Sequence, residues 1–114
     1  MKDKEKLIKE AFEISEYIRY IAVYDNDGLF MKQRSDINNV SSNESDKYEE
    51  LLVNPVLIKL ASQRGNIDCG GLEYFIIRYG NFFVLLIPCK NGHVNMRVEP
   101  DKNPFYLLNL LIPY

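Results

Sequence analysis

His93 and the two cysteines, Cys69 and Cys89, are the residues of this sequence best suited to nucleophilic chemistry. A cysteine nucleophile needs a base within hydrogen-bond reach of its thiol. Cys69 precedes Gly70-Gly71 in an expected loop, where its thiol could be accessible, whereas Cys89 ends an apolar strand and is expected in the core. Because His93 is the only histidine, no site with two histidine ligands can form within one chain.

The acidic residues from position 49 to position 101 show no recognisable acid–base spacing, and we expect them to be solvated surface or turn residues. They are Glu49, Glu50, Asp68, Glu73, Glu99 and Asp101. The glycines mark turns and form no phosphate-binding run. The sequence therefore predicts no catalytic residue, no bound cofactor and no metal site, and a protein that is not an enzyme.

The last expected strand carries a row of polar residues. Alternate side chains of a strand share one face, so the polar residues face one way and the apolar ones the other. The polar row consists of His93, Asn95, Arg97 and Glu99. Such a row usually faces solvent, and the alternative is a polar contact surface for a partner or ligand. We treat these four residues as a candidate partner surface.

The elements around these residues follow from hydrophobic spacing and turn residues. Leu7, Ala11, Ile14 and Ile18 recur at helical spacing. Short strands are expected on either side of Asp25-Asn26-Asp27-Gly28 and in a three-stranded meander near the C-terminus. The expected order is a helix, strands 20–24 and 29–33, a helix from about 47 that Pro55 breaks and Gly65 ends, strands 72–79, 82–89 and 93–99, and a helix over 105–111.

Length and composition set the class of protein. With 114 residues, 46% apolar and 26% charged, the chain is expected to form one α+β domain over residues 1–114. The net charge of −2 gives no reason to expect nucleic acid or an anionic membrane as a partner. The alternating charges near the N-terminus are followed by no long apolar run, so we expect a cytoplasmic protein.

The element order and turns resemble the roadblock (dynein light chain) family of the profilin-like fold. The resemblance rests on Asp25-Asn26-Asp27-Gly28 at the end of the first apolar strand, the meander over 73–99 and the short helix after it. Pro55 and the Gly70-Gly71 segment depart from the family pattern and indicate a divergent subgroup. The resemblance implies a five-stranded antiparallel sheet, a homodimer formed by the third strand, and a small GTPase or a larger complex as partner.

The third strand supports self-association independently of the resemblance. Its residues are apolar or aromatic on both faces, unlike a strand with one face in water. The candidate dimer interface is Tyr74, Phe75, Ile76, Ile77 and Tyr79. If this strand lies at a sheet edge, as the resemblance implies, an uncovered strand of this composition invites pairing with another chain. The alternative is a central strand covered by helices on both sides.

Three functions follow from these features. The leading hypothesis is a non-enzymatic, homodimeric protein-interaction module or regulator. The second is a PAS-like sensor domain that binds a small molecule in a cavity lined by residues such as Phe83, Leu85 and Met96. The third is a cysteine-dependent enzyme that uses Cys69.

Overall fold

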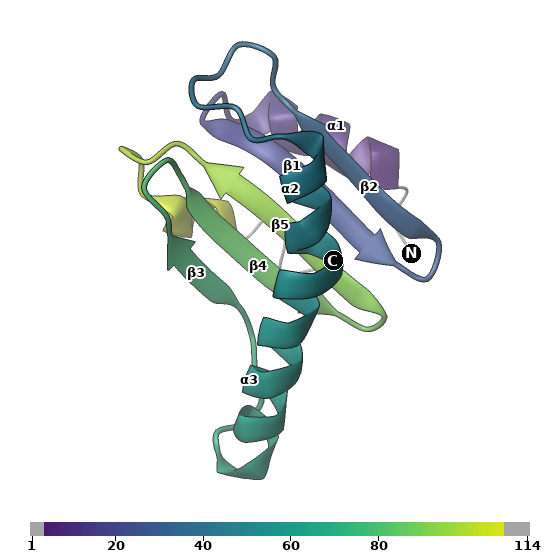
Figure 1. The fold of residues 1–114 in the computed structure, drawn as a ribbon. Helices are drawn as coiled ribbons and strands as arrows, with labels where there is room; N and C mark the ends of the chain where they lie inside the picture. The colour runs from purple at the N-terminus through teal and green to yellow at the C-terminus, as the bar shows by residue number, and fades with distance from the viewer. Residues whose placement is uncertain (1–3, 109–114) are drawn as a thin grey trace.

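The computed structural model describes residues 4–108, in which helices cover both faces of a five-stranded antiparallel sheet (Figure 1). The elements are α1 (Lys4–Ile14), β1 (Ile18–Asp25), β2 (Gly28–Gln33), α2 (Asn43–Tyr48), the π-helical turn η1 (Glu49–Val53), α3 (Asn54–Asp68), β3 (Phe75–Arg78), β4 (Phe83–Cys89), β5 (Gly92–Val98) and the 3-10 turn η2 (Pro104–Leu107). The predicted α+β class and antiparallel sheet are confirmed. No helix among these residues is long and apolar enough to cross a bilayer.

The strands lie in the order β2-β1-β5-β4-β3, so β2 and β3 form the two edges. The β1–β2 hairpin closes at the pair Asp25 and Gly28, where the Asp27 amide donates to Asp25 Oδ1 and Gly28 has a φ of 117°. A positive φ of this kind is favourable only for glycine and a few short polar residues. The turn residues therefore specify this hairpin, as the sequence predicts.

One face of the sheet packs on α1 and forms the apolar core. Leu7, Ile8 and Ala11 of the helix are buried against sheet residues such as Leu85 and Met96. The predicted helical stripe is wrong at its end, because Ile18 begins β1 and Ile14 is 59% exposed. A β-branched residue suits either element, and here pairing with β5 determines its conformation.

The opposite face is covered by one continuous helix made of α2, η1 and α3 (Figure 1). Ser42 caps its start by accepting the Ser45 amide. The predicted break at Pro55 does not occur. The helix widens instead, with the Asn54 amide donating to the Glu49 carbonyl five residues earlier. This wider turn carries the helix past Pro55, which lacks an N–H and whose ring would crowd the carbonyl four residues before it.

The end of α3 lies three residues later than predicted, at Asp68 rather than at Gly65. Gly70 and Gly71, both with positive φ, turn the chain there, and the Gly71 amide donates to the Gly65 carbonyl. A Cβ at Gly65 would lie 3.2 Å from the Leu72 amide nitrogen. The lack of a side chain at Gly65 thus lets the segment that leads from α3 into β3 pass close to the helix.

Two other predicted boundaries also change. The strand expected over 72–79 is shorter, since β3 pairs with β4 only over Phe75–Arg78. The C-terminal helix expected over 105–111 is represented by η2, and the rest of that prediction lies outside the described residues.

Candidate protein-interaction site

Among residues 4–108, the β3 strand lies at an edge of the sheet and pairs only with β4. The alternative of a central strand is therefore wrong. The Tyr79 amide donates to the Phe82 carbonyl at 3.0 Å, and antiparallel pairs alternate along the strand from this point. The backbone groups of Ile77 and Phe75 face β4, whereas those of Ile76 and Arg78 face outward.

The side chains of the predicted interface are only partly covered. Tyr74, Phe75, Ile76 and Ile77 are half-buried, and Tyr79 is 40% exposed. Tyr74 and Ile76 also pack against the apolar core, so part of their surface is already covered within the chain. The surface that β3 offers to a partner is therefore its backbone edge and the outer parts of these side chains.

A second apolar surface lies on the long helix, and we call it the α3 stripe. Its four residues recur at helical spacing and are between 46% and 76% exposed: Leu52, Val56, Leu60 and Ile67. Apolar residues on the other side of the helix, such as Leu57 and Ala61, are half-buried. A helix that is apolar on two sides is typical of one covered on both.

A buried polar cluster fixes the helix to the sheet, and Glu50 lies at its centre. Glu50 is fully buried, and each of its carboxylate oxygens accepts two hydrogen bonds. Oε1 accepts Asn54 Nδ2 at 2.9 Å and pairs with His93 Nε2 at 2.7 Å. Oε2 accepts the Tyr20 hydroxyl at 2.6 Å and Asn95 Nδ2 at 2.7 Å. These bonds hold the π-helical turn on strands β1 and β5.

Arg97 makes the second half of the cluster. Its guanidinium donates to Asp46 Oδ1 and to Glu49 Oε2, each at 2.9 Å, and to the Ser41 hydroxyl at 2.9 Å. The guanidinium also lies 3.8 Å above the centre of the Tyr20 ring. Charge-assisted bonds of this kind are about twice as strong as neutral ones. Together with Glu50 they determine where α3 begins and in which direction it projects.

The surroundings of Glu50 lower the pKa of its carboxyl below the ordinary 4.5. Burial alone would raise this pKa, but the hydrogen bonds from His93, Tyr20 and Asn95 more than offset the effect. The pKa of Arg97 is raised despite its burial, because Glu49, Tyr20 and Asp46 favour the charged form. Glu50 and Arg97 are therefore both ionised at neutral pH.

The expectation of a solvent-facing polar row is wrong for three of its four members. His93, Asn95 and Arg97 are 1%, 0% and 2% exposed, because the helix covers them. They cannot meet a partner while the helix stays in place. Glu99 lies at the rim, where it pairs with Arg19 at 3.0 Å. The solvated position expected for Glu50 is wrong for the same reason.

Sequence reasoning missed the residues that cover the polar row. Asp46, Glu49 and Glu50 are spaced three and four residues apart, which places them on one side of a helix. Three acids on one helix side match a strand that alternates in histidine, asparagine and arginine. This match of charge and spacing is the feature of the sequence from which the buried contact between helix and strand could have been predicted.

The structure does not bring the candidate nucleophile and base into hydrogen-bond contact. His93 Nε2 is bonded to Glu50, whereas the exposed Cys69 thiol donates to Asp68 Oδ1 at 3.4 Å. Burial raises the pKa of the Cys89 thiol, which keeps it protonated. Within residues 4–108, no three histidine, cysteine or acidic side chains are grouped to hold a metal ion.

The sequence matches no protein-family model and no curated protein.

Proposed function

We propose that this protein is a non-enzymatic, homodimeric interaction module that self-associates through β3 and the α3 stripe. The observation that supports it is the open β3 edge, which follows in the chain the helix that carries the four exposed apolar residues of the α3 stripe. An open edge and an exposed apolar patch are each a liability for a monomer. One interface that covers both removes both liabilities.

The geometry of β3 suggests a register for the dimer. Because Ile76 and Arg78 direct their backbone groups outward, two copies can pair antiparallel around Ile76. A two-fold axis there places Tyr74 of one copy opposite Arg78 of the other, a favourable cation–aromatic pair. The axis is perpendicular to the sheet, so both long helices lie on the same face of a ten-stranded sheet.

The role of the buried cluster in this proposal is to position the α3 stripe. Burying ionised groups is costly unless their geometry and hydrogen bonding are well satisfied, and it serves to specify one arrangement. Glu50 and Arg97 tie the helix to β5, and α3 then extends beyond the end of the sheet (Figure 1). A stripe on a helix held in this way is pre-organised for a partner.

The partners that the roadblock resemblance suggests are a small GTPase or a larger complex, with cytoplasmic action. The sensor alternative is less well supported. Of its expected cavity lining, Leu85 and Met96 are fully buried in the core, and Phe83 packs against that core. Two hollows lie along β2, and neither is lined by Phe83, Leu85 or Met96.

Sedimentation velocity with paired variants tests the proposal. Arg78→Pro removes an outward amide while leaving the β3–β4 hydrogen bonds intact, whereas Arg78→Ala keeps that amide. Leu60→Glu places a charge in the α3 stripe, and Lys59→Glu places the same side chain at an exposed position that is not one of the four stripe residues.

We expect the native chain, Arg78→Ala and Lys59→Glu to sediment as dimers. Arg78→Pro and Leu60→Glu should dissociate at least about tenfold more readily, because each leaves an unpaired polar group in the interface. Far-UV circular dichroism verifies that each variant is folded. A native chain that is monomeric, or a Leu60→Glu variant as dimeric as Lys59→Glu, would contradict the proposed interface.

A further inference from the structure

In the part of the chain that the structure describes, the second open edge of the sheet, β2, also has backbone groups that no neighbouring strand pairs. The Arg34 amide donates to the Arg19 carbonyl at 2.9 Å, and the pairs alternate from there toward the turn. The backbone groups of Lys32 and Phe30 therefore face β1. The backbone groups of the alternate residues Leu29, Met31 and Gln33 face outward. This gives three donor–acceptor pairs at the spacing a neighbouring strand requires.

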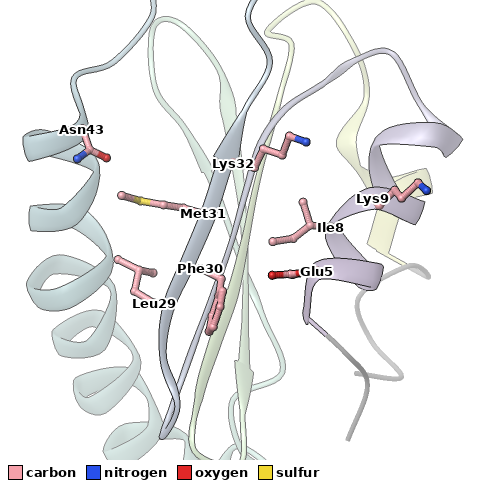
Figure 2. A pocket seen from close by; sticks show the side chains of 8 residues that line it. All are labelled: Glu5, Ile8, Lys9, Leu29, Phe30, Met31, Lys32 and Asn43. Atoms are coloured by element: carbon pink, nitrogen blue, oxygen red, sulfur yellow. The ribbon is translucent and has the colours of Figure 1, made fainter.

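Hollows lie on both sides of this edge, because α1 and α2 stand above and below β2. The first, of about 690 Å³, is lined by Glu5, Ile8, Lys9, Leu29, Phe30, Met31, Lys32 and Asn43. Figure 2 shows Leu29 and Met31 pointing to the α2 side of the strand and Phe30 and Lys32 to the α1 side. A second hollow of about 530 Å³ continues past Gln33 and Arg34 beside α1. Side chains of an added strand would thus have space on both faces.

The charges along the groove favour an acidic ligand, because Lys9 and Lys32 outnumber Glu5, the one acid in the lining of the first hollow. Lys9 and Lys32 are exposed, and within residues 4–108 neither makes an ion pair. The neighbouring Arg34 is engaged by the carbonyls of Ile18, Phe12 and Ser15. Lys9 and Lys32 both line the first hollow, beside the apolar surfaces of Ile8 and Phe30.

We propose that the β2 edge binds an extended peptide segment of another protein as a sixth strand. The segment alternates, with an acidic residue opposite Lys32 and an apolar residue opposite Phe30. Backbone hydrogen bonds supply affinity in this mode of recognition, and the hollows on either side supply specificity. The site is at the other end of the sheet from β3 and is independent of the proposed self-association.

A second copy of this chain fits the same edge less well. Antiparallel pairing of two β2 strands around Met31 would place Lys32 opposite Phe30 of the copy. It would also bring a second Lys9 and a second Lys32 to the same groove, so that four lysines face two acids, the Glu5 of each copy. Like charges across neighbouring strands are destabilising, so an acidic segment is the better occupant.

A synthetic peptide tests the proposal directly. Ac-Ser-Thr-Glu-Val-Leu-Val-Ser-NH2, antiparallel to β2, puts its glutamate opposite Lys32 and its leucine opposite Phe30. Titration followed by heteronuclear NMR should shift the amides of Leu29, Met31 and Gln33 and slow their exchange with solvent. N-methylation of the threonine and both valines, whose amides face β2, should abolish binding. N-methylation of the glutamate and leucine, whose amides face away, should not.

A charge exchange tests the role of Lys32. Lys32→Glu, an exposed substitution, should weaken binding about tenfold, and a peptide with lysine in place of glutamate should restore it. No response at about 1 mM peptide, or responses confined to residues away from β2, would overturn the proposal. Protection of the three amides that rises with protein concentration in the absence of peptide would also overturn it, since it would assign β2 to a second copy.

Discussion

Replacing Glu50 by leucine removes the acceptor at the centre of the buried cluster while keeping a side chain of similar size. Asn95 retains its bond to Glu49, but Tyr20, Asn54 and His93 lose their charged acceptor. A buried donor left without a partner costs about 1–3 kcal/mol, and Glu50→Leu leaves three such groups. Burial of the leucine offsets part of this. We expect the free energy of unfolding to fall by about 3–5 kcal/mol.

Urea unfolding at one fixed protein concentration measures this effect, with tyrosine fluorescence and circular dichroism as probes. The concentration is held constant because self-association would add to the apparent stability. Glu10→Leu is the matched control, since Glu10 is exposed and its pair with Lys6 spans 3.8 Å. The control should change stability by less than about 0.5 kcal/mol. A Glu50→Leu variant within about 1 kcal/mol of the native chain would refute the structural role assigned to the cluster.

The pH dependence of the same pair of proteins tests the charge of Glu50. Its pKa in the folded protein is below the ordinary 4.5, so its ionised form stabilises the fold fully above that pH. As pH falls from 4.5 through the folded pKa, this contribution is lost. The difference in stability between the native chain and Glu50→Leu should therefore be largest above pH 4.5 and narrow below it. A difference that widens on acidification would show that the buried carboxyl is protonated in the native state.

Two further substitutions test the local backbone. Gly92→Ala should lower the free energy of unfolding by about 3 kcal/mol or more in the same urea assay, because its Cβ would overlap the Tyr24 carbonyl. Gly80→Ala should be nearly neutral, because nothing lies within 4 Å of the Cβ that it adds. Equal effects of the two substitutions would contradict the close approach of β1 to β5. Ser42→Ala should cost about 1 kcal/mol by thermal unfolding, because its hydroxyl accepts the Ser45 amide at the start of the long helix, and an unchanged melting temperature would show that this cap is not needed.

The strands and their turns could be predicted from the sequence because short-range signals specify them. Asp25 and Gly28 close the first hairpin, a continuous apolar run outlines β4, and alternation outlines β5. The helix boundaries could not be predicted as well from the sequence. Ile18 suits a helix or a strand, and only its pairing with Val98 decides between them. Gly65 resembles a helix stop, but its lack of a side chain instead accommodates the returning chain.

The buried cluster could not be predicted from β5 alone. A strand with alternating polar residues is typical of a sheet with one face in water. His93, Asn95 and Arg97 are buried because complementary acids lie more than forty residues earlier in the chain. Such non-local pairing is fixed by the tertiary fold and leaves only a weak trace in the helical spacing of Asp46, Glu49 and Glu50.

Hydrogen exchange at β3, measured as a function of protein concentration, tests the proposed self-association most directly. The amides of Ile76 and Arg78 face outward in a single chain, while those of Phe75 and Ile77 bond to β4. If two copies pair along this edge, protection of Ile76 and Arg78 should rise with concentration toward that of their neighbours. Rapid exchange of Ile76 and Arg78 at every concentration would contradict a dimer formed by β3.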